Sequence, residues 1–255
     1  MKKETKEKLD YFVEKYNNST FIEPDPIGLV HRFSDQKDIE IFGLIIATLS
    51  WGNRKSIINS GENLLKIMNN EPFNFIMNFK ENELNLLDDF KHRTFNVFDL
   101  QFFILRLQKI YKRFTSLEEL FAPDFEKNNN SFEAILNFRK EFLGEDNEIR
   151  TKKHVANPNK GSAAKRINMF LRWMVRKDNK GVDFGIWNKI SPSKLSCPLD
   201  IHSGRSARAL NLLQRKQNDW KAVEELDISL RKLDNKDPVK YDFALFGMGI
   251  ESNEF

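Results

Sequence analysis

A lysine and an aspartate lie in two segments whose residue types suit nucleophilic chemistry. Lys165 comes near the end of residues 159–166 (NKGSAAKR), a polar turn with one glycine that leads into an apolar helical stretch. Asp200 lies in residues 198–202 (PLDIH). A lysine amine can attack an electrophilic carbon and form a Schiff base, and a carboxylate can stabilise positive charge or transfer a proton. Lys165 and Asp200 are therefore candidates for such chemistry.

Neighbouring residues complete this hypothesis. The amine of Lys165 reacts only when neutral, and a nearby cation such as Arg166 favours loss of its proton. His202 follows Asp200 by two residues and is a further candidate, either for the chemistry or for a structural or phosphate contact. Each candidate also has a structural explanation, because Asp200 after Pro198 suits a helix N-cap and a lysine in a basic turn suits a solvated surface.

The apolar residues recur mostly at helical spacing, which predicts an all-α fold. The segment 38–49 is apolar nearly all round, as in a helix buried inside a bundle. Pro123 and three consecutive asparagines predict a surface connection over 121–131. The expected helices span 38–49, 56–68, 98–111, 132–142, 167–175, 198–213, 220–233 and 239–246, with an ordered connector over 178–198.

Composition limits the function classes. The chain has 255 residues, and its 41 Lys and Arg against 37 Asp and Glu give a net charge of only +4, so a polyanion site would depend on local clustering. The 40% apolar content and 23 Phe exclude a disordered polypeptide. Cys197 is the single cysteine, which excludes an iron-sulfur cluster.

The sequence also bears on cellular location and on cofactors. The lysine-rich start lacks a signal-peptide core, and no run approaches the ~18 apolar residues of a membrane span. We expect a cytoplasmic, nucleoid-associated monomer without membrane contact. His31, His92 and His154 lack metal-ligand spacing, so no metal and no cofactor are expected.

The lysine turn and the PLDIH string together resemble the helix-hairpin-helix DNA glycosylase superfamily. The nearest comparison is its 8-oxoguanine glycosylase/lyase branch, in the archaeal form with a long connector, and the chain looks like a member of a related bacterial family. By motif position the resemblance implies that Lys165 is the nucleophile, Asp200 the catalytic carboxylate and His202 the histidine of the same string. It also implies base-excision repair of duplex DNA, acting on a damaged base such as an oxidised purine.

Further stretches agree with the order of elements in that superfamily. They are residues 48–53 (TLSWGN), 90–95 (FKHRTF) and 241–246 (YDFALF). The resemblance implies one domain over 1–255 with a core at 38–246, two lobes around an irregular hairpin, and a site in the cleft between them. It assigns the base pocket or wedge to Trp51 and Asn53, and DNA binding to Asn53, Arg54, Arg93, Lys160, Gly161, Ser162, Arg166 and Arg205.

Two departures keep other functions open. The usual hairpin has two glycines around an apolar residue, whereas this chain keeps only Gly161, before Ser162. The interval from Lys165 to Asp200 is also longer than in the common form. A nucleic-acid-binding protein with the same fold but no catalysis is one alternative, and an unrelated helical protein is the other.

Overall fold

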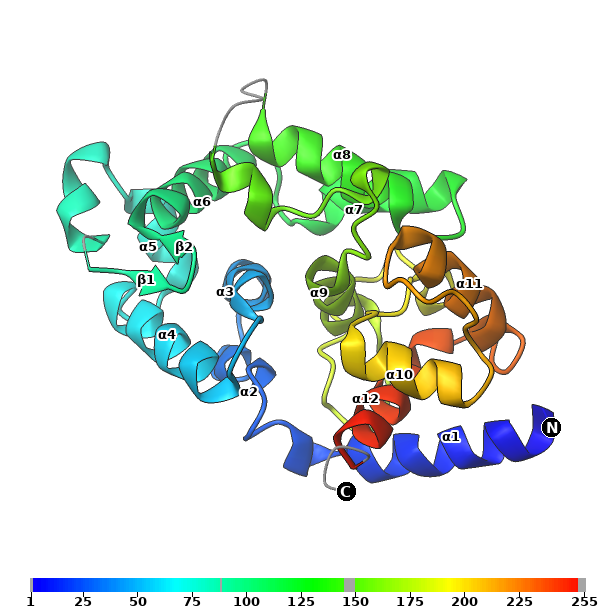
Figure 1. Ribbon diagram of the computed structural model, residues 1–255. Coiled ribbons are helices and arrows are strands. Elements are labelled where there is room, and N and C mark those ends of the chain that lie inside the picture. Colours follow the sequence, from blue (N-terminus) through cyan, green and yellow to red (C-terminus); the bar gives the residue numbers. More distant parts are fainter. Residues whose placement is uncertain (1, 88, 145–149, 252–255) are drawn as a thin grey trace. The chain divides into compact units, whose positions relative to one another are not determined.

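The computed structural model describes residues 2–87, 89–144 and 150–251, and it confirms the all-α class (Figure 1). Within these ranges the only sheet is a hairpin of two short strands, β1 (Lys91–His92) and β2 (Phe95–Asn96), which pair antiparallel with His92 opposite Phe95. No helix in the same ranges is both long enough and apolar enough to cross a bilayer.

The chain divides into two compact units. The Lys165 unit contains the described residues of 1–21, 122–136 and 156–255, and the Trp51 unit contains those of 22–121 and 137–155. Two helices, α7 (Glu118–Lys127) and α8 (Phe132–Leu143), have residues in both units.

The Trp51 unit is built around α3 (Gln36–Leu49), which is buried from Ile39 to Leu49 as the sequence predicts. Asp35 caps this helix through the amides of Lys37 and Asp38. The unit also comprises α2 (Ile27–Val30), α4 (Arg54–Ile67), α5 (Pro72–Asn78), α6 (Val97–Tyr111) and the 3-10 helices Glu81–Leu87 and Arg150–His154. The helices α2, α4 and α5 all contact α3.

The Lys165 unit comprises α1 (Lys2–Tyr16), α9 (Lys165–Val175), α10 (Ile201–Ala209), α11 (Trp220–Arg231), α12 (Tyr241–Glu251) and the 3-10 helices Ser19–Phe21, Pro158–Lys160, Pro192–Lys194 and Pro238–Lys240. Its last helix, α12, packs against α1 and α10. The contact with α1 is close at Gly247, where an added Cβ would lie 2.2 Å from the ring of Tyr16, and the contact with α10 is close at Gly249.

Most expected helices are confirmed, with shifted ends. The helix after Pro198 stops at Ala209 rather than at 213, because Asn211 adopts a left-handed conformation, φ 56°. The predicted connection over 121–131 is wrong for residues 121–127, which continue α7. Pro123 removes one helical hydrogen bond, but burial of Phe121 and Phe125 holds the helix together.

Candidate functional site

The start of α9 is set by the turn that precedes it. Lys165 is the first residue of the helix, and Ala164 before it has a left-handed backbone, φ 51°. The hydroxyl of Ser162 accepts the amide of Ala164 at 3.1 Å. Buried Asn168 donates to the carbonyl of Ala163 at 3.4 Å and accepts the Ser131 hydroxyl at 2.6 Å. These bonds fix where the lysine leaves the turn.

Three backbone amides of this turn donate hydrogen bonds to carbonyl groups of the turn itself. The amides of Lys160 and Ser162 donate to the carbonyl of Asn157, at 3.0 and 3.3 Å, and that of Gly161 donates to Pro158 at 2.8 Å. Gly161 has φ 81°, as glycine readily allows. A phosphate at this turn would therefore be bound by the side chains of Lys160 and Ser162 rather than by these three amides.

Asp200 caps α10 with one of its two carboxylate oxygens. Its Oδ1 accepts the amides of His202 and Ser203, at 2.9 and 3.0 Å, and its own amide donates to the Ser203 hydroxyl at 2.9 Å. The capping interpretation is thus correct. It occupies Oδ1 and leaves Oδ2 for another partner.

That partner is Lys165. Its Nζ lies 3.9 Å from Oδ2 of Asp200, so the predicted pair is brought together. The side chains keep 30% and 29% of their surface exposed, respectively, so both are accessible to a ligand. Nζ also lies 3.5 Å from the sulfur of Met169, one turn along α9. An amine and a carboxylate at this distance can exchange a proton after a small movement.

Sequence reasoning missed Asn218, a residue that binds the backbone of Asp200. The amide of Asn218 donates to the carbonyl oxygen of Asp200 at 2.8 Å, and its oxygen accepts Nη2 of Arg208 at 2.6 Å. Only folding of the loop before α11 brings Asn218 to this position. No local motif signals it.

The other predicted residues of this unit have different surroundings. Arg166 is half-buried, and burial lowers its pKa to about 10, so it stays a cation at neutral pH. His202 is half-buried and lies against Gly249 of α12. Arg205, like Lys160, is exposed and remains a candidate DNA contact.

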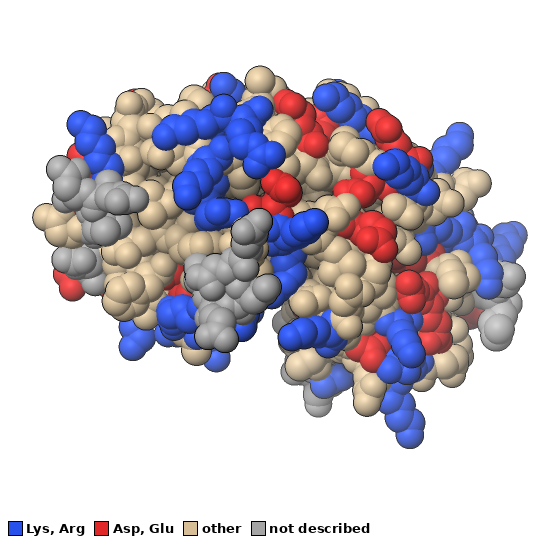
Figure 2. All heavy atoms as spheres, turned by 90° about the horizontal axis from the view of Figure 1, so that it is seen from above, with Lys and Arg blue, Asp and Glu red and all other residues tan. Residues whose placement is uncertain are grey.

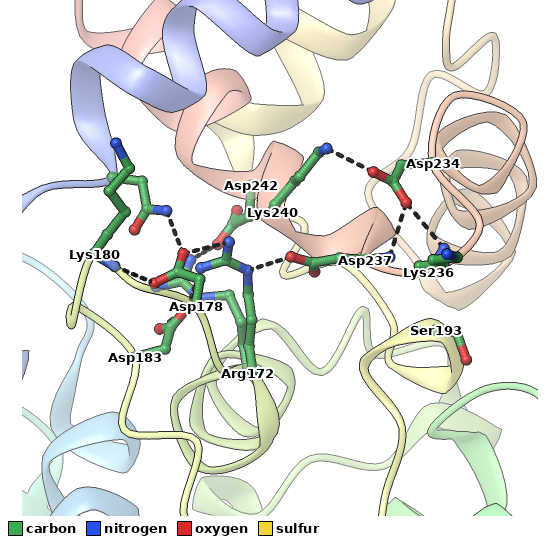
Figure 3. Close-up of polar contacts among 12 residues, drawn as sticks. Arg172, Asp178, Lys180, Asp183, Ser193, Asp234, Lys236, Asp237, Lys240 and Asp242 are labelled. Atoms are coloured by element: carbon green, nitrogen blue, oxygen red, sulfur yellow. Dashed lines mark hydrogen bonds and ion pairs between the residues drawn. The ribbon is translucent and has the colours of Figure 1, made fainter.

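A buried charge network lies along α9 beyond the lysine (Figure 3). Nε of Arg172 bonds Asp183 at 3.1 Å, its Nη1 bonds Asp242, and Arg176 bonds the other oxygen of Asp183 at 3.1 Å. Burial lowers the pKa of Arg172, but the charges of Asp183 and Asp242 outweigh this effect and the net direction is upward. The arginines inside an apolar helix were the only sequence signal for this network.

Trp51 contacts two imidazole rings in its own unit. Its ring is edge-on to His92 with centroids 4.9 Å apart, and lies 5.7 Å from that of His154. Ser60 Oγ is 2.9 Å from Nδ1 of His92, and Nε2 of His154 is 3.3 Å from a carboxylate oxygen of buried Asp99. Half-buried Trp51 is therefore held in one orientation while part of its surface stays accessible.

The loop after Trp51 brings three other predicted residues together. Gly52 has φ 96°, and a Cβ on it would lie 2.5 Å from Nη1 of Arg93. Asn53 caps α4 through the amide of Ser56, at 3.3 Å, and Arg54 opens that helix. Asn53 also lines a shallow polar depression of about 440 Å³ beside α4. The structure thus gathers Trp51, Asn53, Arg54 and Arg93 in one region of the Trp51 unit.

Surface charge is mixed. Figure 2 shows both acidic and basic side chains on the face that it views, with several Lys and Arg side chains gathered in one part of it. Among the residues that the structure describes, no group of three or more His, Cys, Asp or Glu is placed to hold a metal ion.

Comparison with known proteins identifies the family. The family described as "Protein of unknown function (DUF2400)" matches residues 25–251. The chain belongs to this family. Neither the curated proteins nor the solved structures gave a match. Membership spans both units and leaves the activity to be argued from the site.

Proposed function

We propose that this DUF2400 protein is a DNA glycosylase and abasic-site lyase that excises a damaged base through a Schiff base on Lys165. The observation that carries the proposal is the 3.9 Å approach of Lys165 Nζ to Asp200 Oδ2 at a partly exposed place. Two motifs that resemble the glycosylase branch, 35 positions apart in sequence, supply the two groups.

The chemistry assigns each group a step. Nζ of Lys165 attacks C1′ of the deoxyribose, the bond from C1′ to the base nitrogen breaks, and the base leaves with the bonding electrons and takes up a proton. The C1′–O4′ bond then opens, O4′ is protonated, and C1′ and Nζ form an iminium. Loss of a C2′ proton expels the 3′ phosphate. Asp200 stabilises the positive charge that develops on the sugar and accepts protons.

The substrate is a nucleotide rotated out of a duplex. Eversion costs a few kcal/mol and is least costly at damaged pairs, which favours lesions over normal bases. By the resemblance, half-buried Trp51 would stack on a base, and the exposed cations Arg93, Lys160 and Arg205 would bind phosphates. Because the amides of the turn are bonded internally, phosphate binding there depends on side chains.

A lesion panel with borohydride trapping tests the proposal. Duplexes with 8-oxoguanine, uracil or an abasic site are incubated with the protein and then reduced. We expect a covalent adduct on at least one duplex, lost in Lys165→Ala and retained in Lys221→Ala, which removes an exposed lysine of α11. If no duplex gives an adduct but the protein binds DNA in a salt-sensitive way, the protein is a DNA-binding protein and not an enzyme of this kind. No salt-sensitive affinity for DNA or RNA would contradict both functions.

A further inference from the structure

A short segment of the Lys165 unit contacts both halves of the proposed site. Residues 218–220, which we call the clamp segment, run into the first residue of α11. At its start, Nδ2 of Asn218 donates to the carbonyl oxygen of Asp200 at 2.8 Å. At its end, the amide of Trp220 donates to the carbonyl oxygen of Gly161, in the turn before α9, at 3.3 Å. The segment therefore connects the start of α10 to the turn that precedes α9.

The orientation of the Asn218 side chain is fixed by its two partners. Its Oδ1 accepts Nη2 of Arg208 at 2.6 Å. A guanidinium only donates and a carbonyl only accepts, so the oxygen of Asn218 faces Arg208 and its nitrogen faces Asp200. Gly204 leaves room for this arrangement, because an added Cβ would lie 2.7 Å from Oδ1 of Asn218.

The bond from Asn218 fixes the backbone of the residue whose carboxylate caps α10. The same carbonyl oxygen of Asp200 accepts the amide of Gly204 at 3.0 Å, which is the first hydrogen bond of the helix. Oδ1 of Asp200 accepts the amides of His202 and Ser203. With its carbonyl and one carboxylate oxygen both bonded, Asp200 has little freedom to turn. These bonds favour the observed position of Oδ2, 3.9 Å from the lysine amine.

The lysine turn contacts the middle of the clamp segment. Ser162 pairs with Asp219 in an isolated antiparallel bridge. The hydroxyl of Ser162 accepts the amide of Ala164, which is the residue before Lys165. The place at which Lys165 enters α9 thus depends on the clamp segment.

The clamp segment is itself held at the start of α11. Asp219 caps this helix through the amide of Ala222, at 3.2 Å, and both of its carboxylate oxygens bond the guanidinium of Arg215. The ring of Trp220 is buried, and its centroid lies 5.2 Å from that of Phe132. These contacts give both halves of the site a common, fixed support.

We propose that the clamp segment sets the spacing of Lys165 and Asp200, and that Asn218 is the positioning residue for the Asp200 carboxylate. This inference rests on the proposed function, in which the amine and the carboxylate act on one sugar. Misplacement of a reacting group by about 1 Å can lower a rate by about 100-fold. Because Asn218 acts through the backbone of Asp200, its loss should lower the rate of the chemistry and not the affinity for DNA.

Hydrogen exchange at single amides tests the positioning without DNA. Asn218→Ala removes the bond to the carbonyl of Asp200. We expect the amides of His202 and Ser203, which the carboxylate caps, to exchange roughly tenfold faster. Asn128→Ala is the matched control, because Asn128 is also half-buried and donates to a backbone carbonyl of α7, at 3.0 Å. The control should leave exchange at both amides unchanged.

Gly204→Ala is a second variant, which keeps every hydrogen-bonding group. Its Cβ would displace Oδ1 of Asn218, while alanine has a higher helix propensity than glycine. Faster exchange at His202 and Ser203 in this variant therefore cannot come from a weaker helix. We expect the same direction of change as in Asn218→Ala, and Gly204→Ala decides the result if Asn218→Ala does not fold.

Single-turnover excision gives the functional measurement. At saturating enzyme, Asn218→Ala and Gly204→Ala should lower the rate constant of excision roughly tenfold and change the dissociation constant for the lesion duplex by less than about twofold. A variant that only contains less folded protein would lower the amplitude and keep the rate constant. Asn128→Ala should keep both constants.

Unchanged exchange at His202 and Ser203 in Asn218→Ala would overturn the inference. Faster exchange together with a wild-type rate of excision would also overturn it. If the lesion panel detects no activity, the proposed function fails, while hydrogen exchange still decides whether the clamp segment positions Asp200. The two proposals therefore fail separately.

Discussion

Oδ2 of Asp200 lies 3.9 Å from Nζ of Lys165, while Oδ1 of the same carboxylate caps α10. The two oxygens thus have different partners. The structural role and the proposed chemical role of Asp200 can be separated by substitution.

Replacement of Asp200 by asparagine tests that separation. Asparagine caps a helix about as well as aspartate, so Asp200→Asn should change the free energy of unfolding by less than about 1 kcal/mol. Without the charge, base release should fall roughly 100-fold or more. Single-turnover excision and urea unfolding measure the two effects. Asp35→Asn, at the cap of α3, is the matched control and should retain excision. Wild-type turnover in Asp200→Asn would remove this carboxylate from the mechanism.

Trp51 should contribute to lesion binding by stacking. Truncation in Trp51→Ala removes the aromatic face, and we expect affinity for a lesion duplex to fall roughly tenfold, while Trp51→Phe retains most of it. Fluorescence anisotropy with a labelled duplex measures both. Phe98→Ala, which removes an aromatic side chain that is 63% exposed in the same unit, controls for general effects. Equal affinities of Trp51→Ala and wild type would exclude the stacking role.

The exposed cations of the Lys165 unit should set the salt dependence of DNA binding. Lys160→Ala and Arg205→Ala should each lower the slope of log affinity against log salt by about 1, because each cation releases about one counterion from the duplex. Affinity titrations between 50 and 200 mM salt, roughly the range in which such slopes are measured, give the result. Lys232→Ala, at an exposed position after α11, should keep the slope. Unchanged slopes in Lys160→Ala and Arg205→Ala would show that these two residues do not bind the DNA phosphates.

The buried carboxyl of Asp227 should make stability depend on pH. Burial raises its pKa to about 7, against the charge of Arg231 and hydrogen bonds from the Cys197 amide and Ser196. The folded protein then binds more protons than the unfolded chain between about pH 4 and 7. Stability therefore falls as the pH rises through this window and levels off above it.

Asp227→Asn checks the sign of this effect. With the neutral amide, the free energy of unfolding should fall less as the pH rises. The variant should be more stable than wild type at pH 8 by on the order of a few kcal/mol, and similar to it at pH 4. Urea unfolding across this range measures the difference. Asp242, whose pKa burial raises to about 6, also makes stability fall with rising pH, and it does so equally in the variant and in wild type. Parallel curves would show that Asp227 ionises normally in the folded state.

The Lys165 and Asp200 pair was predicted because the short motifs around both residues resemble those of the glycosylase superfamily. A glycine turn before an apolar helix marks the lysine, and a proline before a helix start marks the aspartate. The hydrophobic pattern likewise found α3, which is apolar nearly all round, but it missed α1, where Leu9 and Val13 are the buried apolar residues among those whose burial the structure describes. With so few buried apolar positions among many charged residues, α1 has no clear apolar periodicity in the sequence.

The supporting residues escaped prediction for another reason. Asn218 reaches the carbonyl of Asp200 across 18 positions, and Arg172 reaches Asp242 across 70. Contacts between residues so far apart in sequence produce no periodic pattern along the chain, so they become visible only in the folded structure. Pro123 shows the converse error, since a local breaker signal was outweighed by the burial of its neighbours in α7.

The most direct test locates the covalent bond. The protein is incubated with an abasic duplex, reduced with borohydride and digested, and the peptide that carries the sugar remnant is sequenced by mass spectrometry. The account predicts a single modified residue, Lys165, with modification greatly reduced in Asp200→Asn. Modification of another lysine, or none at all under conditions where the duplex is bound, would contradict it.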